Sequence, residues 1–185
     1  RVAATSAAMS AKAGDPKIVV VIVDDHELFA QGLAMLLTRE WGELFSVAGQ
    51  TTYVEEAADL VARCHADVAI IDLSMPPLGG VAAIRHVKAR HPRTGILALS
   101  GTDDLGLAEE ALRAGAGGYV LKDSPAEEIV EAIHAVMAGR QYLSASIVAA
   151  LRRPSGDDTL TPRERDVLAL IAEGLSSKDI GERLA

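Results

Sequence analysis

Residues 18–25 read IVVVIVDD, six consecutive β-branched residues followed by two carboxylates. The run lacks the alternation of apolar and polar residues that a half-exposed strand shows, so it predicts a strand buried on both faces. Strands of this kind are typical of parallel sheets that carry helices on both faces. The stretch therefore predicts an α/β fold whose first strand ends at Asp24 and Asp25.

The same signature recurs along the chain and alternates with helical patterns. Residues 45–48 form the weakest apolar run, as is expected of an edge strand. The stronger runs are residues 68–71, 96–99 and 118–121. Helical periodicity separates the runs and covers residues 27–39, 54–64, 80–90, 104–114 and 125–138. Five βα units predict a doubly wound, five-stranded parallel sheet with helices on both faces.

The composition narrows the class of protein. Apolar residues make up 49% of the 185 residues but aromatic residues only 3%, so the core is expected to consist of Ala, Val, Leu and Ile. A net charge of −8 argues against a chain that coats nucleic acid or an anionic membrane over its whole surface. The single cysteine, Cys64, excludes an internal disulfide and a cysteine-rich zinc site. No apolar run approaches the ~18 residues that span a membrane, so we expect a soluble, cytoplasmic protein with no membrane partner.

Polar residues follow the predicted strands at the carboxyl edge of the sheet, where open parallel sheets bind ligands. Asp24 and Asp25 end the first strand, Asp72 the third, Ser100 the fourth and Lys122 the fifth. Each has an ordinary explanation on its own, such as a helix cap for the acidic pair and a turn residue for Asp72. Together, three carboxylates at one edge repel each other unless a cation lies among them, and oxygen ligands with open positions suit Mg²⁺.

The other two polar groups complete a site for a phosphoryl group. A cation masks the charge of Asp72, Lys122 supplies a second positive charge, and the Ser100 hydroxyl can bond a phosphoryl oxygen. The set describes phosphoryl transfer to a carboxylate, in which positioning and neutralisation of charge supply most of the catalysis.

These motifs carry a resemblance to a known family. Residues 17–138 resemble the receiver domain of a two-component response regulator in the acidic pair 24–25, in DLSMPPLGG beginning at Asp72, in Ser100, and in GYVLKDS around Lys122. The resemblance implies a flavodoxin-like sheet of strand order 2-1-3-4-5 and a phosphoacceptor at Asp72. In one respect the sequence departs from the family pattern, because Asp123 follows the lysine where many receivers carry a proline.

The same resemblance implies the metal site and the switch residue. Mg²⁺ would be the cofactor, bound directly by Asp25, Asp72 and the backbone carbonyl of Ser74, with Asp24 acting largely through water. Tyr119 falls at the aromatic switch position of the family.

The alternation of apolar runs and helical patterns ends at about residue 138. Residues 152–158 read as a linker, and Thr161-Pro162-Arg163-Glu164 is a capping box that opens a helix closed by Gly174. VDDHELF, GYVLKD and LTPRERDVLALIAEGLSSKDIGERL resemble the NarL/FixJ subfamily, whose output domain is a LuxR-type helix-turn-helix. We therefore expect a disordered arm or tag remnant at 1–16, a receiver domain at 17–138, a linker with a short helix at 139–158 and a partial output domain at 159–185.

The resemblance also places the last helix of the sequence. Residues 177–184 match the scaffold helix, so the sequence is expected to stop before the recognition helix and to leave Ile180 and Leu184 exposed. A dimerising helical hairpin is the alternative interpretation of residues 160–185.

The function implied is that of a response regulator and not of an enzyme. The chain would receive a phosphoryl group from a sensor histidine kinase on Asp72, with Mg²⁺, and control DNA binding and transcription through its output domain. Promoter DNA is the expected partner of the complete protein, and a homodimer is left open.

Three other classes of protein use related features. A phosphatase of the haloacid dehalogenase type also has an Asp nucleophile, but it usually has an acidic residue two positions after that nucleophile. This sequence has Ser74 at that position. A flavodoxin-like electron carrier is disfavoured because DDHELF would repel the FMN phosphate. A stand-alone receiver is disfavoured by the capped helices after Thr161.

Other polar residues are expected to be structural. The histidines, His26 among them, show no ligand spacing and are expected at the surface, and Glu109 is expected on a solvated helix face. Ser124 is expected to cap a helix whose first residue is Pro125. The glycine pair 79–80 is expected to permit the loop after the third strand.

Overall fold

The computed structural model describes residues 16–76, 79–151, 162–175, 179–180 and 183. Its strands form one parallel sheet in the order β2-β1-β3-β4-β5-β6. The strands are β1 (Ile18–Val23), β2 (Phe45–Thr51), β3 (Val68–Asp72), β4 (Gly95–Ser100), β5 (Gly118–Leu121) and β6 (Tyr142–Leu143). The α/β prediction and the order 2-1-3-4-5 are confirmed, with β2 at the edge. The two-residue β6 was not predicted.

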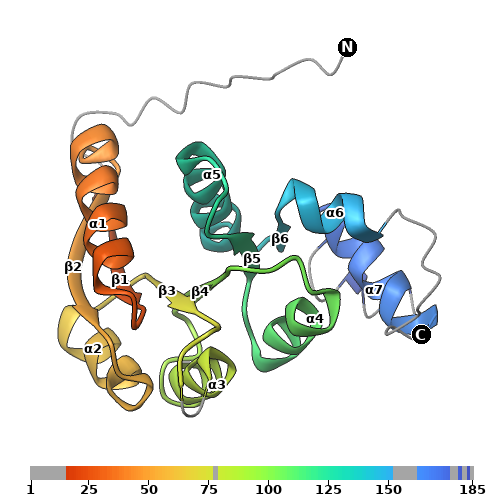
Figure 1. Ribbon diagram of the computed structural model, residues 1–185, viewed down its shortest axis with the longest axis horizontal. Coiled ribbons are helices and arrows are strands. Elements are labelled where there is room, and N and C mark those ends of the chain that lie inside the picture. The colour runs from red at the N-terminus through yellow and green to blue at the C-terminus, as the bar shows by residue number, and fades with distance from the viewer. Residues whose placement is uncertain (1–15, 77–78, 152–161, 176–178, 181–182, 184–185) are drawn as a thin grey trace.

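Helices cover both faces of this sheet (Figure 1). Helices α1 (Glu27–Trp41) and α5 (Ala126–Met137) pack on one face. On the other face lie the 3₁₀ helix η1 (Val54–Glu56) and helices α2 (Ala57–Cys64), α3 (Gly80–Arg90) and α4 (Leu105–Ala114). Helices α6 (Ala145–Leu151) and α7 (Pro162–Ala172) lie beyond β6, at the right of Figure 1.

The apolar strand residues divide between these two faces. Val20 and Ile22 join the core under α1 and α5, whereas Val21 and Val23 join the core under α2, α3 and α4. This alternation explains why the opening run has no polar member, because each of its last four positions is buried. Strand β3 is buried at all five positions and is the centre of the sheet.

Two helix starts differ in how they are capped. Asp104 caps α4, its carboxylate accepting a hydrogen bond of 3.0 Å from the Leu107 N–H. At α5 the predicted cap is wrong: the helix begins at Ala126, and Pro125 precedes it with an extended ψ of 146° and no capping side chain. The Ser124 N–H is instead used in a turn, where it donates to the Leu121 carbonyl at 3.1 Å.

The segment beyond α6 packs onto the face of the sheet that carries α4. Leu168 and Ile171 of α7 are buried and belong to the same apolar cluster as α4. Ile180 belongs to it as well, with only 7% of its surface exposed, so the expectation that it would be exposed is wrong. Thr161 and Leu184, named above as cap and apolar residue, lie outside the described residues.

The loop after β3 needs its two glycines for different reasons. Gly79 adopts φ of +76°, a left-handed conformation that favours glycine. A Cβ on Gly80 would lie 1.9 Å from the Asp72 carbonyl oxygen. The structure therefore agrees with a loop-forming role for the pair, and the second glycine lets α3 start directly against the end of β3.

We expect Gly80→Ala to lower the free energy of unfolding by about 2 kcal/mol or more, since the added carbon can be accommodated only by moving the backbone at Asp72. The matched control is Gly32→Ala in the exposed interior of α1, where a Cβ meets nothing within 4 Å. That change should raise stability by about 0.5–1 kcal/mol through helix propensity. Urea denaturation of the three proteins is the measurement. Equal stability of Gly80→Ala and the parent would show that the loop can accommodate the added carbon without loss of stability.

Candidate functional site

The predicted site residues do meet at the carboxyl edge of the sheet. Backbone bonds continue the ladder past the strands and hold their ends in place. The Asp24 N–H donates to the Thr51 carbonyl at 3.0 Å, and the Lys122 N–H donates to the Ser100 carbonyl at 2.8 Å. The first bond joins the ends of β1 and β2 and the second those of β4 and β5, while the Leu73 N–H, which donates to the Leu99 carbonyl at 2.9 Å, joins the end of β3 to β4.

Two buried carboxylates share one ammonium group at this edge. Lys122 Nζ lies 2.8 Å from Asp24 Oδ2 and 3.0 Å from Asp72 Oδ2, and both aspartates are buried. The same Nζ lies 4.8 Å from the centre of the Phe29 ring of α1, a cation–π distance. Lys122 is therefore held on three sides and neutralises only part of the acidic charge around it.

Burial and the neighbouring charges both act on the pKa of Asp72. Burial is the largest cause and raises this pKa above its ordinary value, and the neighbouring Asp24 carboxylate raises it further. The Ser74 N–H, which donates to Asp72 Oδ1 at 3.1 Å, and the Lys122 ammonium both lower it without cancelling the effect of burial. Ionised Asp72 is thus held at an energetic cost.

His26 was not predicted to take part in the site, but its ring nitrogen lies close to all three carboxylates of the acidic cluster. Its Nδ1 lies 2.9 Å from Asp25 Oδ1, 3.4 Å from Asp24 Oδ1 and 3.7 Å from Asp72 Oδ2. The ring is at the surface as expected, with 64% of the side chain exposed. A single histidine directly after an acidic pair has no spacing that marks it as a ligand, which is why the sequence did not reveal it.

The donor set fits a divalent cation. Within the described part of the chain, Asp24, Asp25, His26 and Asp72 each offer one ligand atom, and these atoms all lie within 4.8 Å of one another. Three shielded carboxylate oxygens, Asp24 Oδ2, Asp25 Oδ1 and Asp72 Oδ2, receive no directed hydrogen bond, and their contacts are ion pairs with Lys122 and His26. An acidic cluster of this composition is typical of a Mg²⁺ site.

Ser100 and Tyr119 meet through a residue that the sequence did not single out, Thr102. The Tyr119 hydroxyl donates to the Thr102 carbonyl at 2.7 Å, and the Thr102 N–H donates to Ser100 Oγ at 3.2 Å. Both Ser100 and Tyr119 are fully buried. Burial is the main cause that raises the pKa of Tyr119, so its hydroxyl stays a donor. Both bonds end on the main chain of Thr102, so this one residue ties the loop between β4 and α4 to Ser100 and to the buried Tyr119.

The fold and this site together define a class of protein. The family model for the response regulator receiver domain matches residues 20–134, and the model for bacterial regulatory proteins of the luxR family matches residues 158–185. The chain belongs to the two-component response regulators of the NarL/LuxR family, which are transcription regulators and not enzymes.

Particular relatives agree with this assignment. The transcriptional regulatory protein MctR of Rhizobium johnstonii is 37% identical over 91% of this chain and 79% of its own length. The nitrate/nitrite response regulator protein NarL of Escherichia coli K12 is 31% identical over 89% of this chain and 80% of its own length. A solved structure of two RcsB dimers bound to two parallel DNAs is similar with a TM-score of 0.67, at 27% identity, over 91% of this chain and 83% of that one.

Within the described residues, no helix combines the length and the apolar character needed to cross a bilayer.

Replacing Asp72 by asparagine should stabilise the cation-free protein at pH 7, by about 1 kcal/mol, because it removes one of two buried charges that share Lys122. A raised folded-state pKa means that the folded protein binds this proton more tightly than the unfolded chain does. The free energy of unfolding of the parent should therefore fall as the pH rises from about 4. The stability advantage of Asp72→Asn should grow over the same pH range.

The measurement is urea denaturation between pH 4 and pH 7 in the presence of a chelator. Asp59→Asn is the control, since Asp59 forms an exposed ion pair with Arg90 and its loss should change stability by less than about 0.5 kcal/mol. A destabilised Asp72→Asn at pH 7 would show that the ion pair with Lys122 outweighs the cost of burial.

Proposed function

We propose that Asp72 is the residue that accepts the phosphoryl group. The observation that carries this proposal is the position of its buried carboxylate, which ends the central strand 3.0 Å from Lys122 Nζ and beside the acidic pair. The donor would be the phosphohistidine of a sensor histidine kinase, the partner that the family implies. A carboxylate oxygen of Asp72 attacks phosphorus, the phosphorus–nitrogen bond breaks, and its electron pair stays on the imidazole of the kinase.

The neighbouring residues have distinct parts in this proposal. Asp25, Asp72 and the Ser74 carbonyl would hold Mg²⁺, with Asp24 acting largely through water, and the ion when bound neutralises charge on the phosphoryl oxygens. Lys122, now paired with two carboxylates, would pair with a phosphoryl oxygen instead. The Ser100 hydroxyl would bond another phosphoryl oxygen, which means leaving its contact with the Thr102 N–H.

A phosphatase of the haloacid dehalogenase type would need an acid two residues after the nucleophile. That position, Ser74, contributes its backbone N–H to Asp72 Oδ1 instead. The serine side chain therefore does not supply the acid that a phosphatase of this type uses at that position.

We propose that the loop between β4 and α4 carries the signal outward. Ser100, Thr102 and Tyr119 form one hydrogen-bonded set, and two residues after Thr102 the side chain of Asp104 caps α4. The ring of Tyr119 is already buried, so the switch would consist of a shift of this loop around the tyrosine rather than entry of the ring. Movement of Ser100 toward the phosphoryl group would then change how α4 begins.

Helix α4 contacts α7 through an ion pair between side chains of the two helices. Arg113 Nη2 lies 2.7 Å from Glu164 Oε1 of α7 and also pairs with Glu109 one turn earlier. Glu109 was expected in solvent but is only 8% exposed. Burial raises its pKa most, Arg113 lowers it, and the adjacent Glu164 raises it. A cavity of about 400 Å³ lies between the helices, lined by apolar residues such as Leu112 and Val167 together with charged ones such as Arg113 and Glu164.

The contact between α4 and α7 joins the proposed receiver domain to the proposed output sequence. We propose a receiver domain at residues 17–138, a linker at 139–158 and LuxR-type output sequence from 159; the arm expected at 1–16 lies, except for Pro16, outside the described residues. Phosphorylation would act on DNA binding by altering the contact between α4 and α7. Promoter DNA and a homodimer are the partners we propose, with support from the related RcsB dimers bound to DNA.

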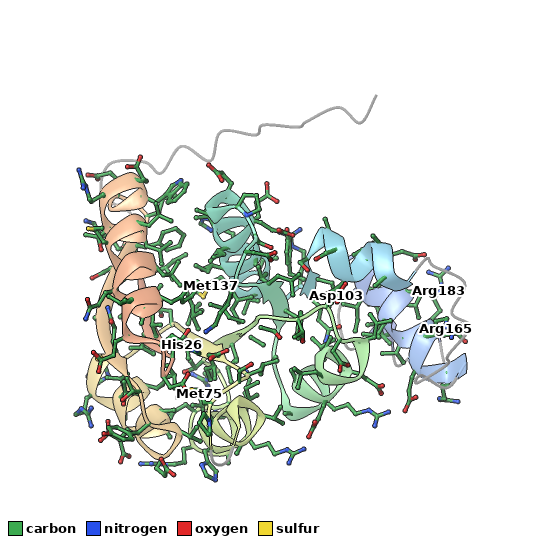
Figure 2. All side chains as sticks on the ribbon, viewed as in Figure 1. His26, Met75, Asp103, Met137, Arg165 and Arg183 are labelled. Carbon is green, nitrogen blue, oxygen red and sulfur yellow. The ribbon has the colours of Figure 1, made fainter. Side chains whose placement is uncertain are left out.

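A small phosphodonor such as acetyl phosphate should label the chain with radioactive phosphate when Mg²⁺ is present, and Asp72→Asn should abolish the label because it removes the nucleophile. Asp103→Asn is the control, since Asp103 is an exposed carboxylate in the loop that precedes α4 (Figure 2). Asp25→Ala should raise the Mg²⁺ concentration needed for half-maximal labelling. Undiminished label on Asp72→Asn would refute the assignment of the phosphoacceptor.

Beryllium fluoride with Mg²⁺, which mimics the phosphoryl group, should shift backbone amide NMR signals of the loop 101–104, of α4 and of α7. In Arg113→Ala the shifts in the loop and α4 should remain while those in α7 shrink, because the link to Glu164 is lost. Arg85→Ala is the matched control: it removes an exposed ion pair between α3 and Glu110 of α4 but leaves the contact with α7. Equal α7 shifts in all three proteins would exclude Arg113 from the path.

A further inference from the structure

We propose that the contact between α4 and α7 responds to pH. The acid pair formed by Glu109 and Glu164 shares one proton when the two helices pack together, and acidification therefore tightens the contact. The inference concerns only the packing of α7 on α4 and does not depend on phosphorylation of Asp72. It gives the chain a second input at the same contact that the proposed phosphoryl signal would change.

The two carboxyl groups of the acid pair meet directly between the helices. Glu109 of α4 and Glu164 of α7 form a side-chain hydrogen bond. Both acids also pair with Nη2 of Arg113, which lies 2.7 Å from Glu164 Oε1. A hydrogen bond between two carboxyl groups requires a proton on one of them, because ionised carboxylates are acceptors only. The contact is thus fully hydrogen-bonded only when the acid pair carries one proton.

Water screens the arginine of this contact more than it screens the two acids. Glu109 is only 8% exposed and the side chain of Glu164 is 24% exposed, whereas the side chain of Arg113 is 65% exposed. The attraction of the arginine is therefore weakened by solvent, and it does not offset the cost of shielding two charges of the same sign. Burial is accordingly the largest cause that raises the pKa of Glu109. Arg113 lowers this pKa, and Glu164 raises it through its charge and its hydrogen bond.

The other groups around the contact do not take the place of the shared proton. The charged residues that line the cavity between the helices are the acid pair, Arg113 and Arg163 of α7. Apart from burial, the pKa of the α4 acid is shifted by Arg113 and by its partner acid. The next acid along α4, Glu110, is exposed and pairs with Arg85 of α3 at 3.4 Å. Gln141, which also lines the cavity, is uncharged, and α6 carries no ionisable side chain.

The sign of the pH effect follows from the two arrangements of the helices. With α7 displaced, Glu109 would be exposed to water and its pKa would return toward the ordinary value, so the packed arrangement binds the proton more tightly. The contribution of this proton to the contact is fully present below the ordinary pKa and is lost as the pH rises through the raised pKa. Between these two values, the equilibrium for packing should weaken by up to about tenfold per pH unit.

The test follows the whole chain by NMR from about pH 4.5 to about pH 8, without a phosphodonor. The carboxyl ¹³C signals of Glu109 and Glu164 report the proton, and the methyl signals of Ile171, a residue of α7 that is 2% exposed, report the contact. In the parent, the Ile171 signals should titrate with the same midpoint as the acid pair. Glu109→Gln replaces one acid by an amide that can donate the same hydrogen bond. Its Ile171 signals should therefore stay at the parent's low-pH position throughout.

Two further variants make the test specific to the acid pair. Glu110→Gln changes the neighbouring acid outside the pair and should titrate as the parent does. Glu164→Gln should lower the midpoint of the Glu109 titration, because it removes the acid that raises it. Ile171 signals that do not change with pH in the parent, or that change equally in Glu109→Gln, would overturn the inference, as would an unchanged Glu109 midpoint in Glu164→Gln. None of these outcomes affects the labelling of Asp72, which is tested separately.

Discussion

The electrostatics of the carboxyl edge of this sheet depend on two buried carboxylates that share one ammonium group. Asp24 and Asp72 are shielded from water, and Lys122 reaches both. Inside a protein such charges are expensive unless they are paired, and one lysine cannot pair fully with two aspartates. The edge is therefore incomplete without a cation. A phosphoryl group would add further negative charge and make the same demand more strongly, which agrees with the position of Lys122 beside the proposed phosphoacceptor.

This electrostatic arrangement depends on the parallel sheet beneath it. Parallel strands all end at one edge, so residues that are far apart in the sequence become neighbours through main-chain register alone. The apolar runs contribute the burial that holds the aspartates out of water, and Gly80 allows α3 to begin against the Asp72 carbonyl. The side chains of the site thus do not hold the sheet together. The sheet imposes their proximity, and the energy of packing offsets the cost of their charges.

Sequence reasoning was reliable where a local pattern has one structural meaning. The β-branched run before Asp24 could only be a buried strand, and the strand ends then located Asp72, Ser100 and Lys122. It failed where the outcome depends on distant packing. The preference of proline for the first helical position did not reveal that α5 would begin one residue later, at Ala126, without a capping side chain. Ile180 is buried because α7 and α4 share one apolar cluster, and His26 turns toward carboxylates that it meets only in the folded chain.

Helix α4 is well suited to transmit a change from this edge because it is shallowly anchored. Its fully buried apolar positions are Ala108 and Ala111, which contribute little apolar area, and its leucines at 105, 107 and 112 are only partly buried against the core. The third buried residue, Glu109, is an acid whose burial costs energy and whose neighbour across the contact is another acid, Glu164. A cavity lies between α4 and α7 where close packing would otherwise hold them. In the proposed mechanism, a helix held this weakly would shift when Ser100 moves, whereas the deeply packed β3 would not. The contact with α7 is therefore where the proposed phosphorylation of Asp72 would have its effect.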